Sequence, residues 1–364
     1  MWQVIGQPQT IALLEHSLSA GSLAHAYLFL GPPHVGKGTL ALNLAQALNC
    51  EGDEPPCGQC QSCRRIAEGK YADVRVIALN SSGDSDSVKQ QKQIGINDIK
   101  EIQHIASLPP YEGKYKVFII DGAEYLSSEA ANCLLKLLEE PPPRVVLLLL
   151  AVEEGRLLAT IISRCQRIEL KPISVKEVEK ILIDSHGVDC EKARLIARLS
   201  EGCLGWALNV LIQDNLLSRR IQRIDKLVSL LSAGWEERLA YAAELAGQFD
   251  RSRKSVDEVI RLWFVWWRDL LLAKSGCENA IINIDYELTL REEARGFSLV
   301  QIKDVLGSLQ RAREQIAKNV NPRLVFEVLM LSLPGKGESC GVTGGLSIPR
   351  SSQYIDVQDN RCAF

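Results

Sequence analysis

Seven residues near the N-terminus have the spacing of a phosphate-binding loop. They read Gly31-Pro-Pro-His-Val-Gly36-Lys37 and stand between a short apolar run and a helical pattern. In such a loop, backbone amides and a lysine surround the phosphates of a nucleotide. Its position between a predicted strand and a predicted helix indicates a P-loop fold.

The loop lacks the hydroxyl group that a nucleotide-bound magnesium ion needs. The residue after the lysine should be Ser or Thr, but here it is Gly38, and Thr39 comes one residue too late. We therefore do not expect magnesium coordination. Two interpretations stay open: the loop binds ATP, or Lys37 only caps a degenerate turn.

A second apolar run ends in a carboxylate at Asp121, where a magnesium-binding aspartate belongs. Gly122 then stands where an ATPase carries the glutamate that activates water. Glu124 follows three residues after Asp121, and we expect it on the next helical turn, where it would not serve as the general base.

Four cysteines form another candidate site. Cys50, Cys57, Cys60 and Cys63 follow the pattern C-x6-C-x2-C-x2-C around a loop that contains Gly and Pro. Four thiolates at this spacing suit a closed, tetrahedral zinc site, which would also order a loop that cannot bury a core. An iron–sulfur cluster uses a similar run, but the usual following Cys-Pro is absent, which favours structural zinc.

Length and composition exclude several classes of protein. The chain has 364 residues, of which 46% are hydrophobic and 24% charged, enough for two or three domains. Eleven cysteines without a secretion signal indicate reduced thiols, and no apolar run is long enough to span a membrane. We expect a cytoplasmic protein with no membrane contact. A net charge of -3 argues against DNA binding by the chain alone.

The sites lie in an α/β part that two helical parts follow. Four apolar runs alternate with helical stretches, as in a parallel sheet with crossover helices; they are 26–30, 74–78, 117–120 and 145–150. The predicted divisions are a core over 1–171 with the cysteine module at about 50–63, a small helical domain over 172–213, a helical bundle over 214–334, and a disordered tail over 335–364. Within the small domain we expect helix breaks at Gly187, Gly202 and Gly205.

An aromatic stripe marks the helical bundle. Trp263, Trp266 and Trp267 recur at helical spacing, and Leu270 and Leu271 extend the same face. Aromatic residues at this spacing are more often core than binding surface, so we predict core or subunit packing.

With these motifs in this order, the chain resembles the clamp-loader subunits of bacterial DNA polymerase III, which are AAA+ proteins, and most closely the delta-prime type. The resemblance covers nearly everything before the tail. Its most specific part surrounds Asp121 and continues through Leu138-Glu139-Glu140-Pro141-Pro142. The other matching stretches are 4–7, 25–29, the cysteine module, 160–165, 267–271 and 319–324.

The resemblance implies a role for Arg164, which lies in the motif Ser163-Arg164-Cys165. In the family this arginine reaches the ATP held by the neighbouring subunit, where it would stabilise charge on the transferred phosphoryl group. From the residues alone, Arg164 would be taken for a surface ion pair.

Two further departures from the ATPase pattern accompany the glycines. Ala151-Val152 stands where ATPase members carry a polar sensor residue, and Trp206 is the residue that we align with their sensor arginine. The resemblance thus implies an AAA+ P-loop core, a helical lid domain and an all-α collar domain, without ATP hydrolysis by the chain itself.

The implied function is that of a noncatalytic clamp-loader subunit in a hetero-pentameric ring. Its partners would be gamma/tau motor subunits, the delta subunit, the sliding clamp and primer–template DNA. One alternative is a working ATPase of the gamma/tau type, in which Thr39 or water replaces the missing ligand. Another is a stand-alone, zinc-containing P-loop protein that binds DNA.

Overall fold

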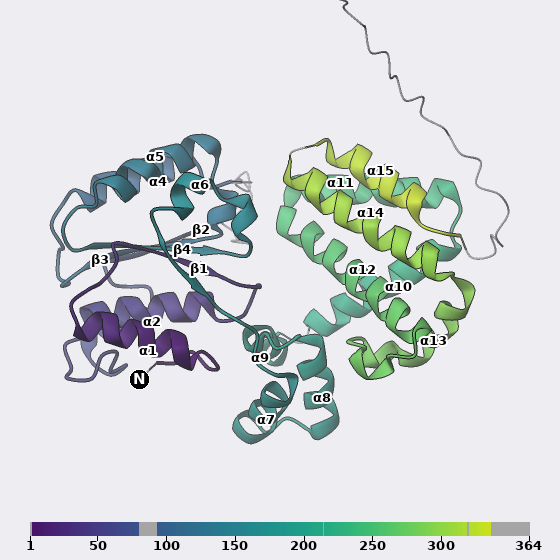
Figure 1. Ribbon diagram of the computed structural model, residues 1–364, viewed down its shortest axis with the longest axis horizontal. Coiled ribbons are helices and arrows are strands. Elements are labelled where there is room, and N and C mark those ends of the chain that lie inside the picture. The colour runs from purple at the N-terminus through teal and green to yellow at the C-terminus, as the bar shows by residue number, and fades with distance from the viewer. Residues whose placement is uncertain (1, 80–92, 214, 319, 336–364) are drawn as a thin grey trace, which may run out of the picture.

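The computed structural model describes residues 2–79, 93–213, 215–318 and 320–335. All but the first residue of the predicted tail lies outside this part of the chain. An α/β core is followed by a small group of helices and then by a larger helical bundle (Figure 1). This order confirms the predicted fold class.

The core contains one sheet of five parallel strands in the order β2-β3-β4-β1-β5. All four predicted runs form strands. The fifth lies at the sheet edge with only Ile168 buried, so its sequence carries little apolar signal. The strands are β1 (Ala26–Leu30), β2 (Val74–Ala78), β3 (Lys116–Asp121), β4 (Val145–Ala151) and β5 (Gln166–Glu169).

Helices cover both faces of this sheet, with α1 and α2 on one face and α4 and α5 on the other (Figure 1). Along β1, Tyr27 and Phe29 join one core, while Leu28 and Leu30 join the other, because successive side chains of a strand point to opposite faces. The helices are α1 (Pro8–Ser19), α2 (Lys37–Asn49), α3 (Gln61–Ala67), α4 (Ile96–Ala106), α5 (Ser128–Glu139) and α6 (Ala159–Ile162), with short 3-10 turns η1 (Ala123–Tyr125) and η2 (Glu154–Arg156).

The small helical part has its own apolar core, built around residues such as Leu182 and Ile196. Gly187 ends the first helix with φ of 62° and Gly202 has φ of 82°, so two predicted breaks are confirmed. The break predicted at Gly205 is wrong, because this residue lies in the first turn of a helix. The helices are α7 (Val175–His186), α8 (Cys190–Leu199) and α9 (Leu204–Ile212).

The bundle buries the aromatic stripe. Trp263, Trp266 and Trp267 are each at most 1% exposed and belong to one core, which confirms the core interpretation. The elements are α10 (Asn215–Ser232), α11 (Trp235–Arg251), α12 (Arg253–Lys274), η3 (Glu278–Ala280), η4 (Ile284–Tyr286), α13 (Glu287–Gly296), α14 (Leu299–Ala317) and α15 (Pro322–Ser332).

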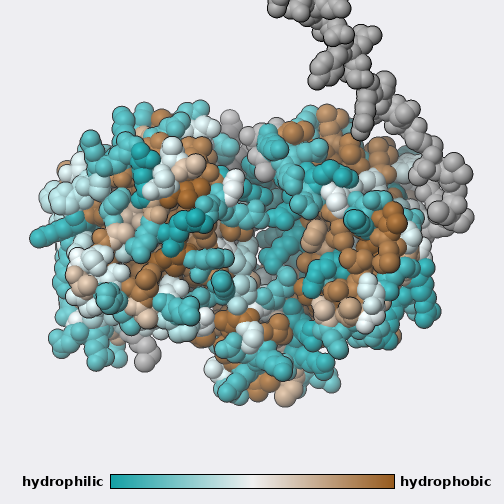
Figure 2. Space-filling model, in the orientation of Figure 1, coloured by the Kyte–Doolittle hydropathy of each residue, from teal (hydrophilic) through white to brown (hydrophobic). Residues whose placement is uncertain are grey.

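Apolar side chains also reach the surface of the bundle, where Figure 2 shows brown patches among hydrophilic residues. On α15, Leu324, Val328 and Leu331 are exposed and recur at helical spacing. In the described part of the chain, no helix has the length and hydrophobicity to cross a membrane.

Candidate functional site

Two glycines shape the phosphate loop between β1 and α2. Gly31 has φ of 148° and Gly36 has φ of 109°, conformations that L side chains rarely adopt. A Cβ atom at Gly31 would also lie 2.5 Å from the carbonyl oxygen of Leu170. The two glycines therefore let the chain turn sharply from the strand into α2, whose N-terminal amides suit an anion.

Lys37 lies inside this loop and is 8% exposed. Its Nζ donates to the carbonyl oxygens of Gly31 at 2.5 Å and Pro32 at 2.9 Å. Burial lowers the pKa of the ammonium group, while the carboxylates of Glu124 and Asp121 act in the opposite direction. In this arrangement the lysine braces the loop, and it must leave two carbonyls to reach a phosphate.

Gly38 and Thr39 follow Lys37 and are both exposed. No atom lies within 4 Å of the point where a Cβ would stand at Gly38, so packing does not force the loss of a hydroxyl there. Thr39 lies about 100° farther around α2, because each residue of a helix turns by that angle. The Thr39 hydroxyl therefore does not occupy the position of the hydroxyl that is missing at Gly38.

The carboxyl end of β3 presents a different arrangement from the one expected. Gly122 has φ of 85°, and this left-handed turn leads into η1, which carries Glu124. One oxygen of Glu124 accepts a hydrogen bond from Val152 N at 3.3 Å. Its other carboxylate oxygen is buried and has no hydrogen-bond partner among the described residues. Glu124 thus lies beside the sensor position at the end of β4.

The carboxylate of Glu124 interacts electrostatically with Lys37 of the phosphate loop. Burial raises the pKa of its carboxyl group, and the positive charges of Lys37 and Arg156 partly oppose that rise. Glu124, expected on the next helical turn, lies in the short 3-10 helix η1, directly after the left-handed turn that Gly122 permits.

Arg164 follows α6 and lies at the surface of the core. Its Nη1 donates to Thr160 O at 3.0 Å, and its Nη2 lies 2.7 Å from Glu139 Oε1. The side chain is 36% exposed. Its contacts are with residues outside the phosphate loop of this chain, so its guanidinium group can face another molecule.

The four cysteines come together between α2 and α3. Their sulfur atoms all lie within 4.8 Å of one another, and those of Cys57 and Cys63 are 4.0 Å apart. Tetrahedral zinc with Zn–S bonds of about 2.3 Å would place its sulfur ligands about 3.8 Å apart. The cluster therefore fits one tetrahedral ion, and it is tight for a cluster that places its ligands on separate iron atoms.

Backbone amides prepare these sulfurs to carry negative charge. N–H groups of Cys60 and Gln59 donate to the Cys57 sulfur and lower the pKa of that thiol to about 6. Cys63 is buried, and its burial raises the pKa of its thiol. Further N–H···S hydrogen bonds run from Gly52 and Cys57 to Cys50 and from Cys63 to Cys60, over 3.4 Å each.

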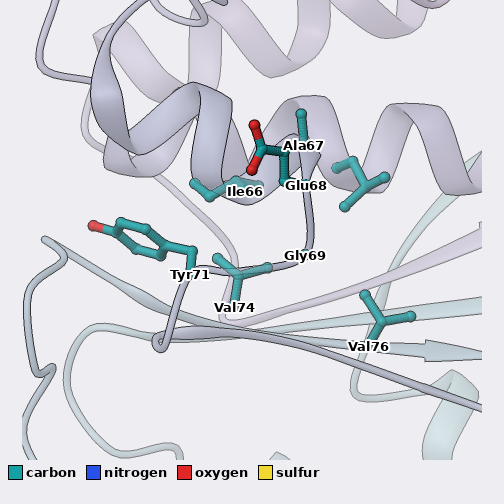
Figure 3. A pocket seen from close by; sticks show the side chains of 8 residues that line it. Ile66, Ala67, Glu68, Gly69, Tyr71, Val74 and Val76 are labelled. Atoms are coloured by element: carbon teal, nitrogen blue, oxygen red, sulfur yellow. The ribbon is translucent and has the colours of Figure 1, made fainter.

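A groove of about 380 Å³ lies between α2, α3 and β2 (Figure 3). It includes no residue of the phosphate loop or of the cysteine cluster. Glu68, at its rim, forms an ion pair with Lys70. The groove is therefore separate from the candidate site. Its lining residues are Leu42, Ile66, Ala67, Glu68, Gly69, Tyr71, Val74 and Val76.

Residues 6–174 match the family described as DNA polymerase III, delta subunit. The chain is 29% identical to the Bacillus subtilis delta-prime subunit of DNA polymerase III over 328 residues, covering 90% of this chain and 96% of that protein. It is also 29% identical to the B. subtilis tau subunit over 352 residues, covering 91% of this chain but 60% of tau.

The chain belongs to the clamp-loader AAA+ family. Its match to the gamma/tau subunit of Mycobacterium tuberculosis, 32% identical over 363 residues, also spans 91% of this chain and 60% of the relative. Among solved structures, a gamma-subunit-related protein of Thermotoga maritima aligns at 18% identity with a TM-score of 0.38, covering 87% of this chain and 97% of that one.

Clamp-loader ATPases carry a sensor arginine in the small helical domain, and we aligned Trp206 with it. The structure instead packs Trp206 against the apolar core of that domain. Gly205 meets the phosphate loop: its N–H donates to His34 O at 3.0 Å, and a Cβ atom there would lie 2.7 Å from that oxygen. Gly205, the residue before Trp206, is therefore the residue of this segment that contacts the phosphate loop. The sequence alone could not show this, because the contact joins residues far apart in the chain.

Proposed function

We propose that this chain is a noncatalytic subunit of the DNA polymerase III clamp loader, of the delta-prime type. It would supply Arg164 to ATP on a neighbouring gamma/tau subunit. In a hetero-pentameric ring that also contains the delta subunit, it would help to load the sliding clamp on primed DNA in the cytoplasm.

One observation carries the noncatalytic part of this proposal: glycine occupies three positions that would act on ATP. Gly38 replaces the magnesium-binding hydroxyl, Gly122 the water-activating glutamate, and Gly205 faces the loop from the small domain. Each loss removes a different contribution to phosphoryl transfer, namely metal binding, activation of water and stabilisation of charge. Meanwhile Lys37 binds the loop's own carbonyls.

The surface position of Arg164 supports its role toward a neighbour. An arginine supplied from another subunit can raise the rate of phosphoryl transfer by about 10³- to 10⁵-fold. The exposed apolar face of α15 supports assembly of the bundle as a collar, because contiguous apolar surface commonly marks a subunit contact. We propose the same domain limits as the sequence predicts: a core over 1–171, a lid domain over 172–213 and a collar domain over 214–334.

Zinc is the metal that we assign to Cys50, Cys57, Cys60 and Cys63. Four thiolates close the coordination shell, so the ion would order the loop between α2 and α3 and would leave no position for a substrate. Its role is structural.

Glu124 favours a second candidate, an active motor subunit of the gamma/tau type. Its carboxylate lies close enough to Lys37 for each charge to affect the pKa of the other group. If Thr39 or water completed the magnesium shell, Glu124 could act as the general base.

One experiment separates the two candidates. It measures ATP binding and ATP hydrolysis by the purified chain alone, with and without magnesium. The noncatalytic subunit shows no turnover. Magnesium-dependent turnover that disappears in Glu124→Gln would establish the motor subunit instead.

A further inference from the structure

Arg164 is held by a carboxylate that the proposed function does not use. Its Nη2 lies 2.7 Å from Glu139 Oε1, while its Nη1 donates to Thr160 O and lies 3.4 Å from Ser163 Oγ. Both terminal nitrogens therefore have partners within the chain. For Arg164 to bind a phosphate with Nη2, its ion pair with Glu139 must break.

Helix stability does not explain why Glu139 is acidic. It is the last residue of α5, and Glu140 follows it. The C-terminal end of a helix carries partial negative charge, which disfavours carboxylates there. Arg164 supplies the compensating positive charge from the turn that follows α6.

The exposure of the pair makes it suited to exchange. Arg164 is 36% and Glu139 50% exposed, and ion pairs this accessible to water are weak. A triphosphate carries more charge than one carboxylate, and an arginine can bind it with two parallel hydrogen bonds. It would therefore displace Glu139 from Arg164, the arginine finger of the proposed function, whereas a diphosphate offers this finger less negative charge.

We propose that Glu139 is a positioning residue that competes with the γ-phosphate of the neighbour's ATP for Arg164 and takes the arginine back after hydrolysis. This inference rests on the proposed function of Arg164. It assigns regulation to the same site: the finger engages a nucleotide triphosphate and releases the diphosphate product.

The test uses the ring reconstituted from the full chain and its ATPase partners, with hydrolysis measured over a range of ATP and ADP concentrations. In Glu139→Gln, the finger loses its competitor. We expect the KM for ATP to fall about two- to fivefold and inhibition by ADP to strengthen by a similar factor. Glu139→Asp, which keeps the charge, should restore much of the normal ADP inhibition.

Glu140→Gln is the matched control, because it removes the same charge from the adjacent exposed residue, which has no ion pair in the described part of the chain. It should leave KM and ADP inhibition unchanged. The inference is overturned if Glu139→Gln behaves like this control, or lowers the rate at unchanged KM, while Arg164→Ala still slows hydrolysis. An unchanged rate in Arg164→Ala would remove the proposed function itself.

Discussion

The backbone N–H of Gly205 donates to the carbonyl oxygen of His34 over 3.0 Å, so the first turn of α9 rests directly on the phosphate loop. This contact joins the small helical part of the chain to the loop between β1 and α2. It also explains why position 205 has no side chain, because a Cβ atom there would lie 2.7 Å from His34 O.

Gly205→Ala should therefore destabilise the protein. In an open helix this change usually stabilises by roughly 0.5–1 kcal/mol, but here the crowded Cβ should reverse the sign and cost about 1–2 kcal/mol. Gly247→Ala is the matched control, because Gly247 lies within α11 with open space around it. Urea unfolding that shows the same gain for both variants would rule out the close contact.

Glu124→Gln should change how stability depends on pH. Burial raises the carboxyl pKa in the folded protein, so the unfolded chain loses its proton first as pH rises. The folded state then binds more protons, and the contribution of Glu124 to stability falls as pH rises from the usual range of Glu through the raised pKa. The variant should therefore be more stable relative to the native protein at pH 8 than at pH 4. The same difference in free energy of unfolding between the variant and the native protein at both pH values would contradict this prediction.

The cysteine module should bind one metal ion per chain. Replacing Cys57 with Ser removes one of the four ligands, so the bound metal should be lost and the melting temperature should fall by several degrees. Cys190→Ser, an exposed thiol outside the cluster, serves as the control. Metal analysis by mass spectrometry together with thermal unfolding checks both; zinc retained at full occupancy by Cys57→Ser would refute the assignment.

Arg238 should be important for stability of the bundle. It is buried, and its guanidinium group donates to carbonyls at the end of α10 and near the end of the described chain. Arg238→Met leaves these carbonyls without their donors and should cost roughly 2–4 kcal/mol. Arg323→Met, which breaks an exposed pair with Glu327, should cost less than about 0.5 kcal/mol. Chemical denaturation of the two variants checks the contrast.

Local patterns were enough to predict much of the fold. Four strands stand out because their residues are mostly apolar, and three of them, β1, β3 and β4, are almost wholly buried. The spacing of Gly31, Gly36 and Lys37 locates the turn between β1 and α2. The cysteine cluster follows from spacing as well, since Cys57, Cys60 and Cys63 lie within seven residues. In each of these cases, the residues that cooperate are close in sequence.

The remaining features depend on geometry that local spacing does not encode. Glu124 accepts a hydrogen bond from Val152, which lies 28 residues farther along the chain, after the left-handed turn at Gly122. Gly205 meets His34, and Glu139 meets Arg164, through packing of elements that are distant in the chain. The sequence of the edge strand β5 does not indicate a strand, because Ile168 is its one apolar residue.

The proposed role of Arg164 is tested most directly by comparing Arg164→Ala with Lys37→Ala in the reconstituted ring, with ATP hydrolysis measured in the presence of clamp and primed DNA. If this chain lends an arginine but does not itself hydrolyse ATP, Arg164→Ala should slow the neighbouring site by about 10³-fold or more, and Lys37→Ala should leave the rate of an assembled ring unchanged. The reverse pattern, in which Lys37→Ala slows hydrolysis and Arg164→Ala does not, would show that this chain does not supply an arginine to its neighbour.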